Sequence, residues 1–237
     1  MARVANVTAT DFPLAQQMPS SPWWLRVRHG FSVGALVVAP LLGLAWSLLV
    51  PIFRGSLDVE VTNVAARHAP FVTGTYLGVL MSFAMIPAAM AWGRLVRPAA
   101  PVVSDVATFL CAAGACFHGG VLVFQLAEAS VVAGVHDHGA AVQAVTHLFD
   151  TSAFFLVLAP FILFYVGLAA LAVILFVQRA ADRWIAPFVL VAIAVELASP
   201  LPFKARLFFA MLTIAFAGVA RAVWQVGAED WAARAAA

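Results

Sequence analysis

The chain has 237 residues, of which 64% are hydrophobic and 10% are charged, and its formal net charge at pH 7 is +2. A soluble domain is about half apolar and about a quarter charged, so this composition excludes a water-soluble core and predicts that lipid surrounds most of the chain. The small net charge is spread along the chain, which argues against a nucleic-acid partner.

The chain opens with a polar leader, residues 1–20, in which hydrophobic periodicity is weak. We expect this leader to be mobile and cytoplasmic. A helix start follows, with Ser21 as the N-cap and Pro22 at the first helical position. The two adjacent Trp residues that come next, with Arg26 just beyond them, predict a short helix that lies at the level of the lipid headgroups.

Six apolar segments follow, and each predicts a transmembrane helix. Most hold about 20 residues, the length that an ~30 Å hydrocarbon layer requires at ~1.5 Å per residue. The fifth holds about 16 residues and therefore needs a thinned bilayer or a protein neighbour. The predicted fold class is all-α, with a single six-helix transmembrane domain over residues 21–226 and a short cytoplasmic tail at 227–237. The predicted spans are 31–51, 71–92, 101–127, 151–177, 184–199 and 205–224.

Basic residues set the predicted orientation. Most Lys and Arg residues lie in the leader, in the loops after the second and fourth spans, and in the tail. The positive-inside rule then places both termini in the cytoplasm. The preference for Arg over Lys, with abundant Ala and Val, suggests the plasma (inner) membrane of a bacterium. On this topology the loop after the third span faces outward.

Residues 128–152 carry acids and histidines but neither Lys nor Arg. In an extended segment His136 and His138 project to one side, and His147 shares a helical face with Asp150. Imidazoles with a carboxylate suit Zn²⁺, Cu²⁺ or Fe²⁺. The sequence therefore predicts an outward-facing site that binds one of these divalent metals or relays protons, built from His118, Glu128, His136, His138, His147 and Asp150.

Each member of this site has an alternative role. The loop matches no sharp metal motif, so its histidines could simply be solvated, and Asp150 could be the N-cap of the fourth span. His118 lies about 15 Å inside its span, where an ionisable group indicates function by default. Its alternatives are a hydrogen-bonded core residue or a haem ligand. Glu196 is expected to form an ion pair with Lys204 or Arg206 or, alternatively, to be a proton acceptor.

Two further functions remain open at this point. The first is a non-catalytic accessory or scaffold subunit of a larger membrane complex, or a homo-oligomer, that associates through Gly74 and Gly78. The second is a small transporter with two inverted three-helix halves, suggested by Pro40 and Pro160 at corresponding depths. The chain has no phosphate loop, nucleophile elbow or dinucleotide fingerprint, so no enzyme class is indicated.

Overall fold

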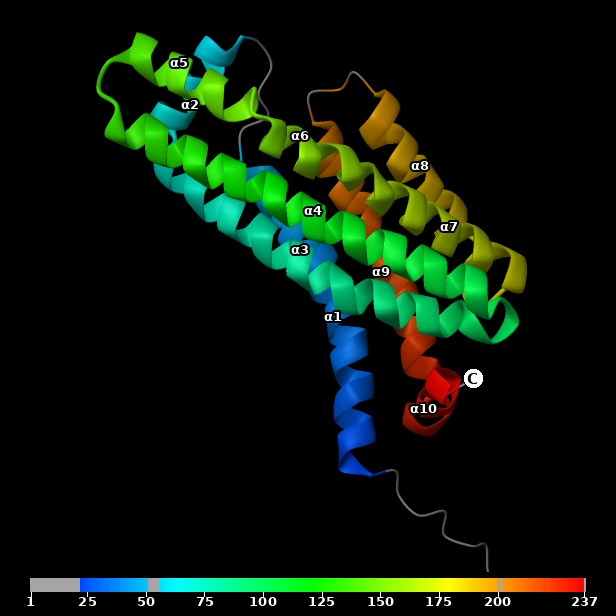
Figure 1. The fold of residues 1–237 in the computed structure, drawn as a ribbon. Coiled ribbons are helices and arrows are strands. Elements are labelled where there is room, and N and C mark those ends of the chain that lie inside the picture. Colours follow the sequence, from blue (N-terminus) through cyan, green and yellow to red (C-terminus); the bar gives the residue numbers. More distant parts are fainter. Residues whose placement is uncertain (1–21, 51–55, 200, 202, 237) are drawn as a thin grey trace, which may run out of the picture.

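A computed structural model describes residues 22–50, 56–199, 201 and 203–236, and this part of the chain is all-helical (Figure 1). The predicted leader, residues 1–20, lies outside the described residues. In chain order the helices are α1 (Trp23–Leu49), α2 (Leu57–Ala66), α3 (His68–Val96), α4 (Pro101–Gly134), α5 (His138–Phe149), α6 (Ser152–Leu158), α7 (Ile162–Gln178), α8 (Ile185–Ala198), α9 (Lys204–Val226) and α10 (Ala228–Ala236).

Within the described residues, five helical stretches are long and apolar enough to cross a membrane. They are α1, α3, α4, the α6–α7 stretch Ser152–Gln178, and α9. The fifth predicted span, 184–199, corresponds to α8, which is apolar but only 14 residues long. The all-α prediction and these five long apolar helices are therefore confirmed.

The main helices are arranged as a closed ring. In the described part of the chain α1, α3, α4, α7, α8 and α9 each pack against the next, and α9 returns to pack against α1. The connections between neighbours are mostly short, which makes consecutive helices antiparallel. Small residues permit the closest approach: a Cβ on Gly114 of α4 would collide with the backbone of Phe164 in α7. The helix backbones are in contact there, as small residues allow in helix bundles.

The predicted interfacial N-terminal helix is wrong. Helix α1 runs without a break from Trp23 to Leu49, so the paired Trp residues form the start of the first long helix. The segment around Gly30 contains no residue that must end a helix, because a helical glycine costs only about 1 kcal/mol relative to alanine. Pro22 is the N-cap residue instead of the first helical position, and Ser21 lies outside the described part.

The predicted short tail is a docked helix. Helix α10 packs against α1 and α3, and its Trp231 side chain is 2% exposed. The guanidinium of Arg94 lies over the Trp231 ring at 5.4 Å from the centroid. Arg234 Nη1 donates a hydrogen bond to the Leu95 carbonyl oxygen at 2.9 Å. The tail therefore covers the end of the bundle at which α1 begins.

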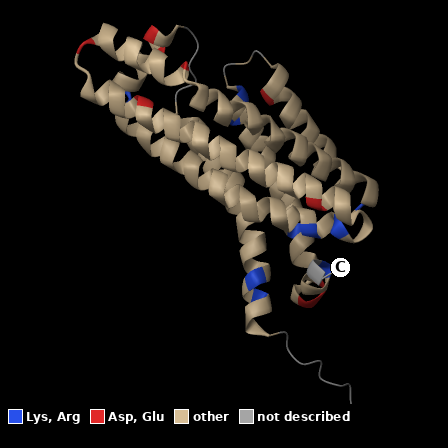
Figure 2. Cartoon of the chain, viewed as in Figure 1, with Lys and Arg blue, Asp and Glu red and all other residues tan. Residues whose placement is uncertain are grey.

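The opposite end of the bundle carries a small helical cap. Helices α2 and α5 pack on each other and against α4, and Val61, Ala141 and Val145 form their buried contact. Figure 2 shows acids concentrated toward this end and most Lys and Arg residues near the end where α1 begins and α9 finishes.

Gly74 and Gly78, which were predicted to form a face for association between subunits, pack against other helices of the same chain. A Cβ on Gly74 would meet Val50 and Leu49 of the α1 end, and a Cβ on Gly78 would meet Leu122 of α4 and Trp46 of α1. Both glycines are buried in α3. They serve the internal packing of the ring.

Candidate functional site

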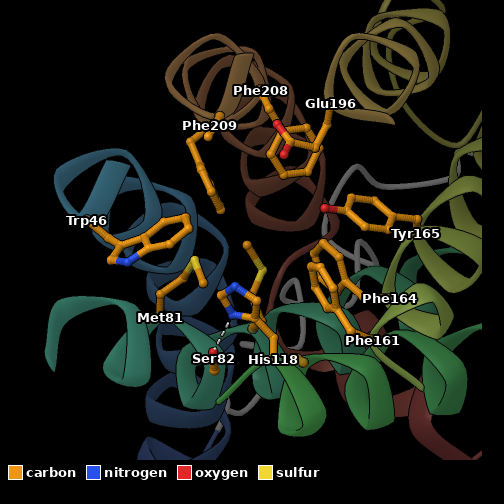
Figure 3. A pocket seen from close by; sticks show the side chains of 13 residues that line it. Trp46, Met81, Ser82, His118, Phe161, Phe164, Tyr165, Glu196, Phe208 and Phe209 are labelled. Carbon is orange, nitrogen blue, oxygen red and sulfur yellow. Dashed lines mark hydrogen bonds between the residues drawn. The ribbon is translucent and has the colours of Figure 1, made fainter. Parts of the chain in front are cut away.

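The centre of the ring contains a cavity of ≈ 90 Å³ (Figure 3). This volume admits several water molecules, since one water needs about 10–15 Å³ measured in this way. All six helical stretches of the ring contribute to the wall: Trp46 from α1, Ser82 from α3, His118 from α4, Tyr165 from α7, Glu196 from α8 and Phe209 from α9. No single stretch of sequence builds this site.

Six side-chain rings form a closed circuit around the cavity. Consecutive ring centroids are 4.8 to 5.8 Å apart. Such neighbours contribute about 0.5–1.5 kcal/mol per pair beyond simple area burial, and their interlocking fixes the shape of the wall. The circuit runs through Trp46, His118, Phe161, Tyr165, Phe208 and Phe209 and back to Trp46.

The imidazole of His118 is held by one hydrogen bond. Its Nδ1 atom lies 2.9 Å from the hydroxyl oxygen of Ser82, which is itself 3.1 Å from the Gly78 carbonyl oxygen. A carbonyl only accepts, and a hydroxyl has one hydrogen, so both bonds are satisfied when Ser82 donates to Gly78 and Nδ1–H donates to Ser82. In this tautomer Nε2 keeps its lone pair as an acceptor for a group in the cavity.

Glu196 supplies the carboxyl group of the cavity. Its Oε2 atom is buried and has no hydrogen-bond partner among the residues that the structure describes. Figure 3 shows this carboxyl group beside Phe208, with the Tyr165 hydroxyl pointing into the space between the helices. Because an unpaired buried carboxyl group is costly, its position requires a partner, a proton or a ligand.

The expected ion pair of Glu196 is not formed among the described residues. Lys204 Nζ donates instead to the backbone carbonyl oxygen of Glu196 at 2.8 Å. Arg206 Nε donates to the backbone carbonyl oxygen of Ser47 at 3.1 Å. The basic side chains thus bind the backbone at helix ends, and Glu196 lines the cavity. Its role as a proton acceptor stays a prediction.

The predicted histidine loop is built differently from the expectation. Asp137 is the N-cap of α5 and accepts a hydrogen bond from the Ala140 amide at 2.7 Å, so His136 precedes the helix and His138 is its first residue. Asp137 itself is extended, and His138 is helical. His138 Nε2 lies 2.7 Å from Asp58 Oδ1 in an exposed pair with α2.

The remaining loop residues point elsewhere. His147 and Asp150 are exposed. Asp150 is the C-cap of α5, and Thr151 is the N-cap of α6, where its hydroxyl accepts from the Phe154 amide at 3.3 Å. The N-cap of this helix is therefore Thr151, and the N-cap role expected for Asp150 is not observed.

Glu128 is fully buried in α4, away from the cavity wall. Neither of its carboxyl oxygens has a hydrogen-bond partner in the described part of the chain. Glu60 of α2 lies within electrostatic range of it, and burial raises the pKa of the Glu60 carboxyl above its ordinary value.

The predicted metal-binding residues are consequently dispersed. Only His118 lies in the cavity, while Glu128 lies under the cap and the others are exposed at its surface. Across the ranges that the structure describes, no three His, Cys, Asp or Glu side chains come close enough to hold a metal ion.

Several residues of the site were not predicted from the sequence. Ser82, Tyr165 and Trp46 lie on three helices that are far apart in the chain. A polar residue within an apolar span is a weak signal, and an aromatic residue there gives none, because both are common in such helices. Only the closed ring brings them together.

Neither a family model, nor a curated protein, nor a solved structure matches this chain. The function of the cavity is therefore inferred from its geometry alone.

Proposed function

We propose that this chain is a membrane protein of six transmembrane helices, with both termini in the cytoplasm of a bacterial inner membrane. We propose further that its central cavity is an outward-facing site that binds a small ligand and relays protons through His118 and Glu196. The observation that carries this proposal is that two proton-accepting groups from different helices, α4 and α8, line one cavity.

The outer surface of the ring supports a lipid environment. Large apolar side chains on several helices are exposed, among them Leu80, Phe109, Val123, Val173 and Val177. Soluble proteins rarely expose so much contiguous apolar surface. The short helix α8 packs between α7 and α9, which supplies the protein neighbour that a span of this length requires.

The charge distribution supports the orientation. Basic residues of the described part gather at the end where α1 begins and α9 finishes (Figure 2). By the positive-inside rule this end is cytoplasmic. Glu196 is close to the end of α8 and Ala205 to the start of α9, and both line the cavity. The cavity therefore lies nearer the opposite, outer end.

The chemistry of the wall supports proton transfer. His118 presents an acceptor nitrogen, Tyr165 a hydroxyl and Glu196 a carboxyl group, and the cavity has space for water between them. Ionisable side chains at such depth in membrane proteins commonly mark proton or ion pathways. Water molecules bridge polar groups with nearly the strength of direct hydrogen bonds.

The proposal is tested by reconstitution into liposomes that contain a pH-sensitive dye. With an inward proton gradient, wild-type protein is expected to acidify the lumen faster than protein-free liposomes. His118→Gln and Glu196→Gln are expected to slow this rate by ~10²-fold, as loss of a positioned proton-transfer group does. His147→Gln, which changes an exposed histidine outside the cavity, is the matched control and should retain the wild-type rate. A wild-type rate equal to that of protein-free liposomes would exclude proton relay.

A further inference from the structure

We propose that the central cavity selects a small organic ammonium ion, a methylated amine with at least one N–H. This inference rests on the proposed role of the cavity as a ligand site and specifies the chemical class of the ligand. It is carried by a closed aromatic wall, a buried carboxyl group and a free imidazole nitrogen in one cavity of limited size.

The wall has the composition of a cation-binding aromatic cage. Trp46, Phe161, Tyr165, Phe208 and Phe209 belong to the circuit of rings, and every one of them lines the cavity. A cation within about 6 Å of an aromatic face is attracted by the ring quadrupole, and cages of this kind recognise alkylated ammonium groups. The neighbouring rings are turned steeply against one another in most pairs, by 88° for Trp46 and His118 and by 87° for Trp46 and Phe209. The cavity is therefore enclosed from several directions.

The carboxyl group decides the sign of the ligand charge. Glu196 places a buried Oε2 atom without a hydrogen-bond partner at this wall. A buried carboxylate disfavours an anion and is stabilised by a cation. Lys204 lies within electrostatic range of this carboxyl group. Its Nζ atom and Arg206 Nε are nevertheless bound to backbone carbonyl oxygens at 2.8 and 3.1 Å, so neither base donates a hydrogen bond to Oε2.

The imidazole discriminates among ammonium ions. His118 Nδ1 is engaged with Ser82, so Nε2 accepts a hydrogen bond only from a ligand that carries a hydrogen on nitrogen. A trimethylammonium ion offers one such N–H, whereas a tetramethylammonium ion offers none. The wall thus favours the former even though the latter carries the same charge.

The volume limits the size of the ligand. A cavity of ≈ 90 Å³ has room for several waters and hence for a ligand of a few non-hydrogen atoms. Phe209 and Met81 line the cavity, and their side chains lie against Gly43 of α1. They therefore close the space toward that helix. Larger alkylammonium ions are excluded by this packing.

The test is calorimetric titration of the detergent-purified full chain at constant ionic strength. The probes are trimethylammonium chloride, tetramethylammonium chloride and tert-butanol. The last is a neutral molecule with the shape of tetramethylammonium, and its O–H offers one donor hydrogen, as the N–H of trimethylammonium does. Trimethylammonium is expected to bind saturably and at least ~10-fold more tightly than tert-butanol, the ratio that a desolvated cation–π contact provides. Tetramethylammonium is expected to bind with an intermediate affinity.

Two variants locate the binding. Glu196→Gln keeps the shape of the side chain and removes its charge, and it should weaken trimethylammonium binding by ~10-fold or more while leaving tert-butanol unaffected. Glu60→Gln, a half-buried acid of α2 outside the cavity, should bind as the wild type does. Equal wild-type affinities for trimethylammonium and tert-butanol, or no saturable binding of trimethylammonium, would overturn the inference.

The wild-type comparison of probes decides the question even where Glu196→Gln fails to fold, because it needs no variant. The outcome is also separable from that of the proton assay. Proton flux without trimethylammonium binding would remove the ligand class alone. Trimethylammonium binding without proton flux would remove the relay and retain the ligand site.

Discussion

Ser82 of α3 and His118 of α4 meet inside the helical ring with 2.9 Å between the hydroxyl oxygen and Nδ1. This contact joins two adjacent helices and sets which nitrogen of the imidazole faces the cavity. A buried histidine whose partner is removed loses both its fixed tautomer and a hydrogen bond.

Ser82→Ala is therefore expected to destabilise the protein by about 1–3 kcal/mol, the cost of leaving a buried donor without a partner. Thermal unfolding in detergent measures this as a lower Tm. Ser130→Ala in α4 is the matched control, because the Ser130 hydroxyl also donates to the carbonyl four residues earlier but is exposed. Equal shifts in Tm for the two variants would show that the Ser82–His118 bond contributes nothing measurable.

The contact between α4 and α7 gives a second prediction. Gly114→Ala places a methyl group against the backbone of Phe164, which cannot move without displacing a helix. We expect destabilisation of about 3 kcal/mol or more, at the upper end of the range for overpacked cores.

Gly34→Ala in α1 is the control for this change, since a Cβ there meets nothing within 4 Å. It should be neutral or stabilise the protein by up to about 1 kcal/mol, because alanine is the better helix former. Chemical or thermal unfolding of both variants, with size-exclusion profiles, measures the difference. A stable Gly114→Ala variant would contradict the close approach of these helices.

Glu60 gives a pH-dependent prediction. Burial raises the pKa of this carboxyl above its ordinary value of 4.5, because the fold disfavours the charged form. The contribution of the residue to stability is therefore complete below pH 4.5 and is lost as the pH rises through the raised pKa.

Glu60→Gln removes this titration. We expect its Tm to equal that of the wild type near pH 4, to exceed it increasingly as the pH rises from 4.5 through the raised pKa, and to keep a constant excess above that pKa. Thermal unfolding of both proteins across this pH range measures the effect. A difference in Tm that does not change with pH would show that Glu60 is solvated in the folded protein.

The dispersed histidines give a prediction about metal. Asp137 caps α5 and His138 pairs with Asp58, so we expect no Zn, Cu or Fe above background in the purified protein. The double variant His136→Ala and His138→Ala should leave the metal content unchanged. Elemental analysis of both preparations measures this, and stoichiometric metal that disappears in the double variant would restore the loop site predicted from the sequence.

The sequence by itself determined the helices. Long apolar runs are sufficient to predict α3 and α4, since predicted spans 71–92 and 101–127 lie within His68–Val96 and Pro101–Gly134. Local chemistry was less decisive at helix ends, where Thr151 caps α6 in place of the predicted Asp150. Adjacent polar residues compete for such positions with small differences in free energy. The internal repeat stays a prediction, although Pro40 lies inside a continuous helix and Pro160 in a short 3₁₀ turn.

Tertiary structure alone decided the site. His118 could be singled out from its depth in an apolar run, because a buried imidazole needs a partner, but neither Ser82 nor Glu196 could be assigned to it. Their encounter depends on the return of α9 to α1, which closes the ring and places one face of every main helix on a common interior. The hydropathy of a helix shows how apolar it is. It gives little information on which face packs against the other helices, because the opposite face contacts lipid and is also apolar. The choice of face is made by the fit of small residues such as Gly114 against neighbouring backbone.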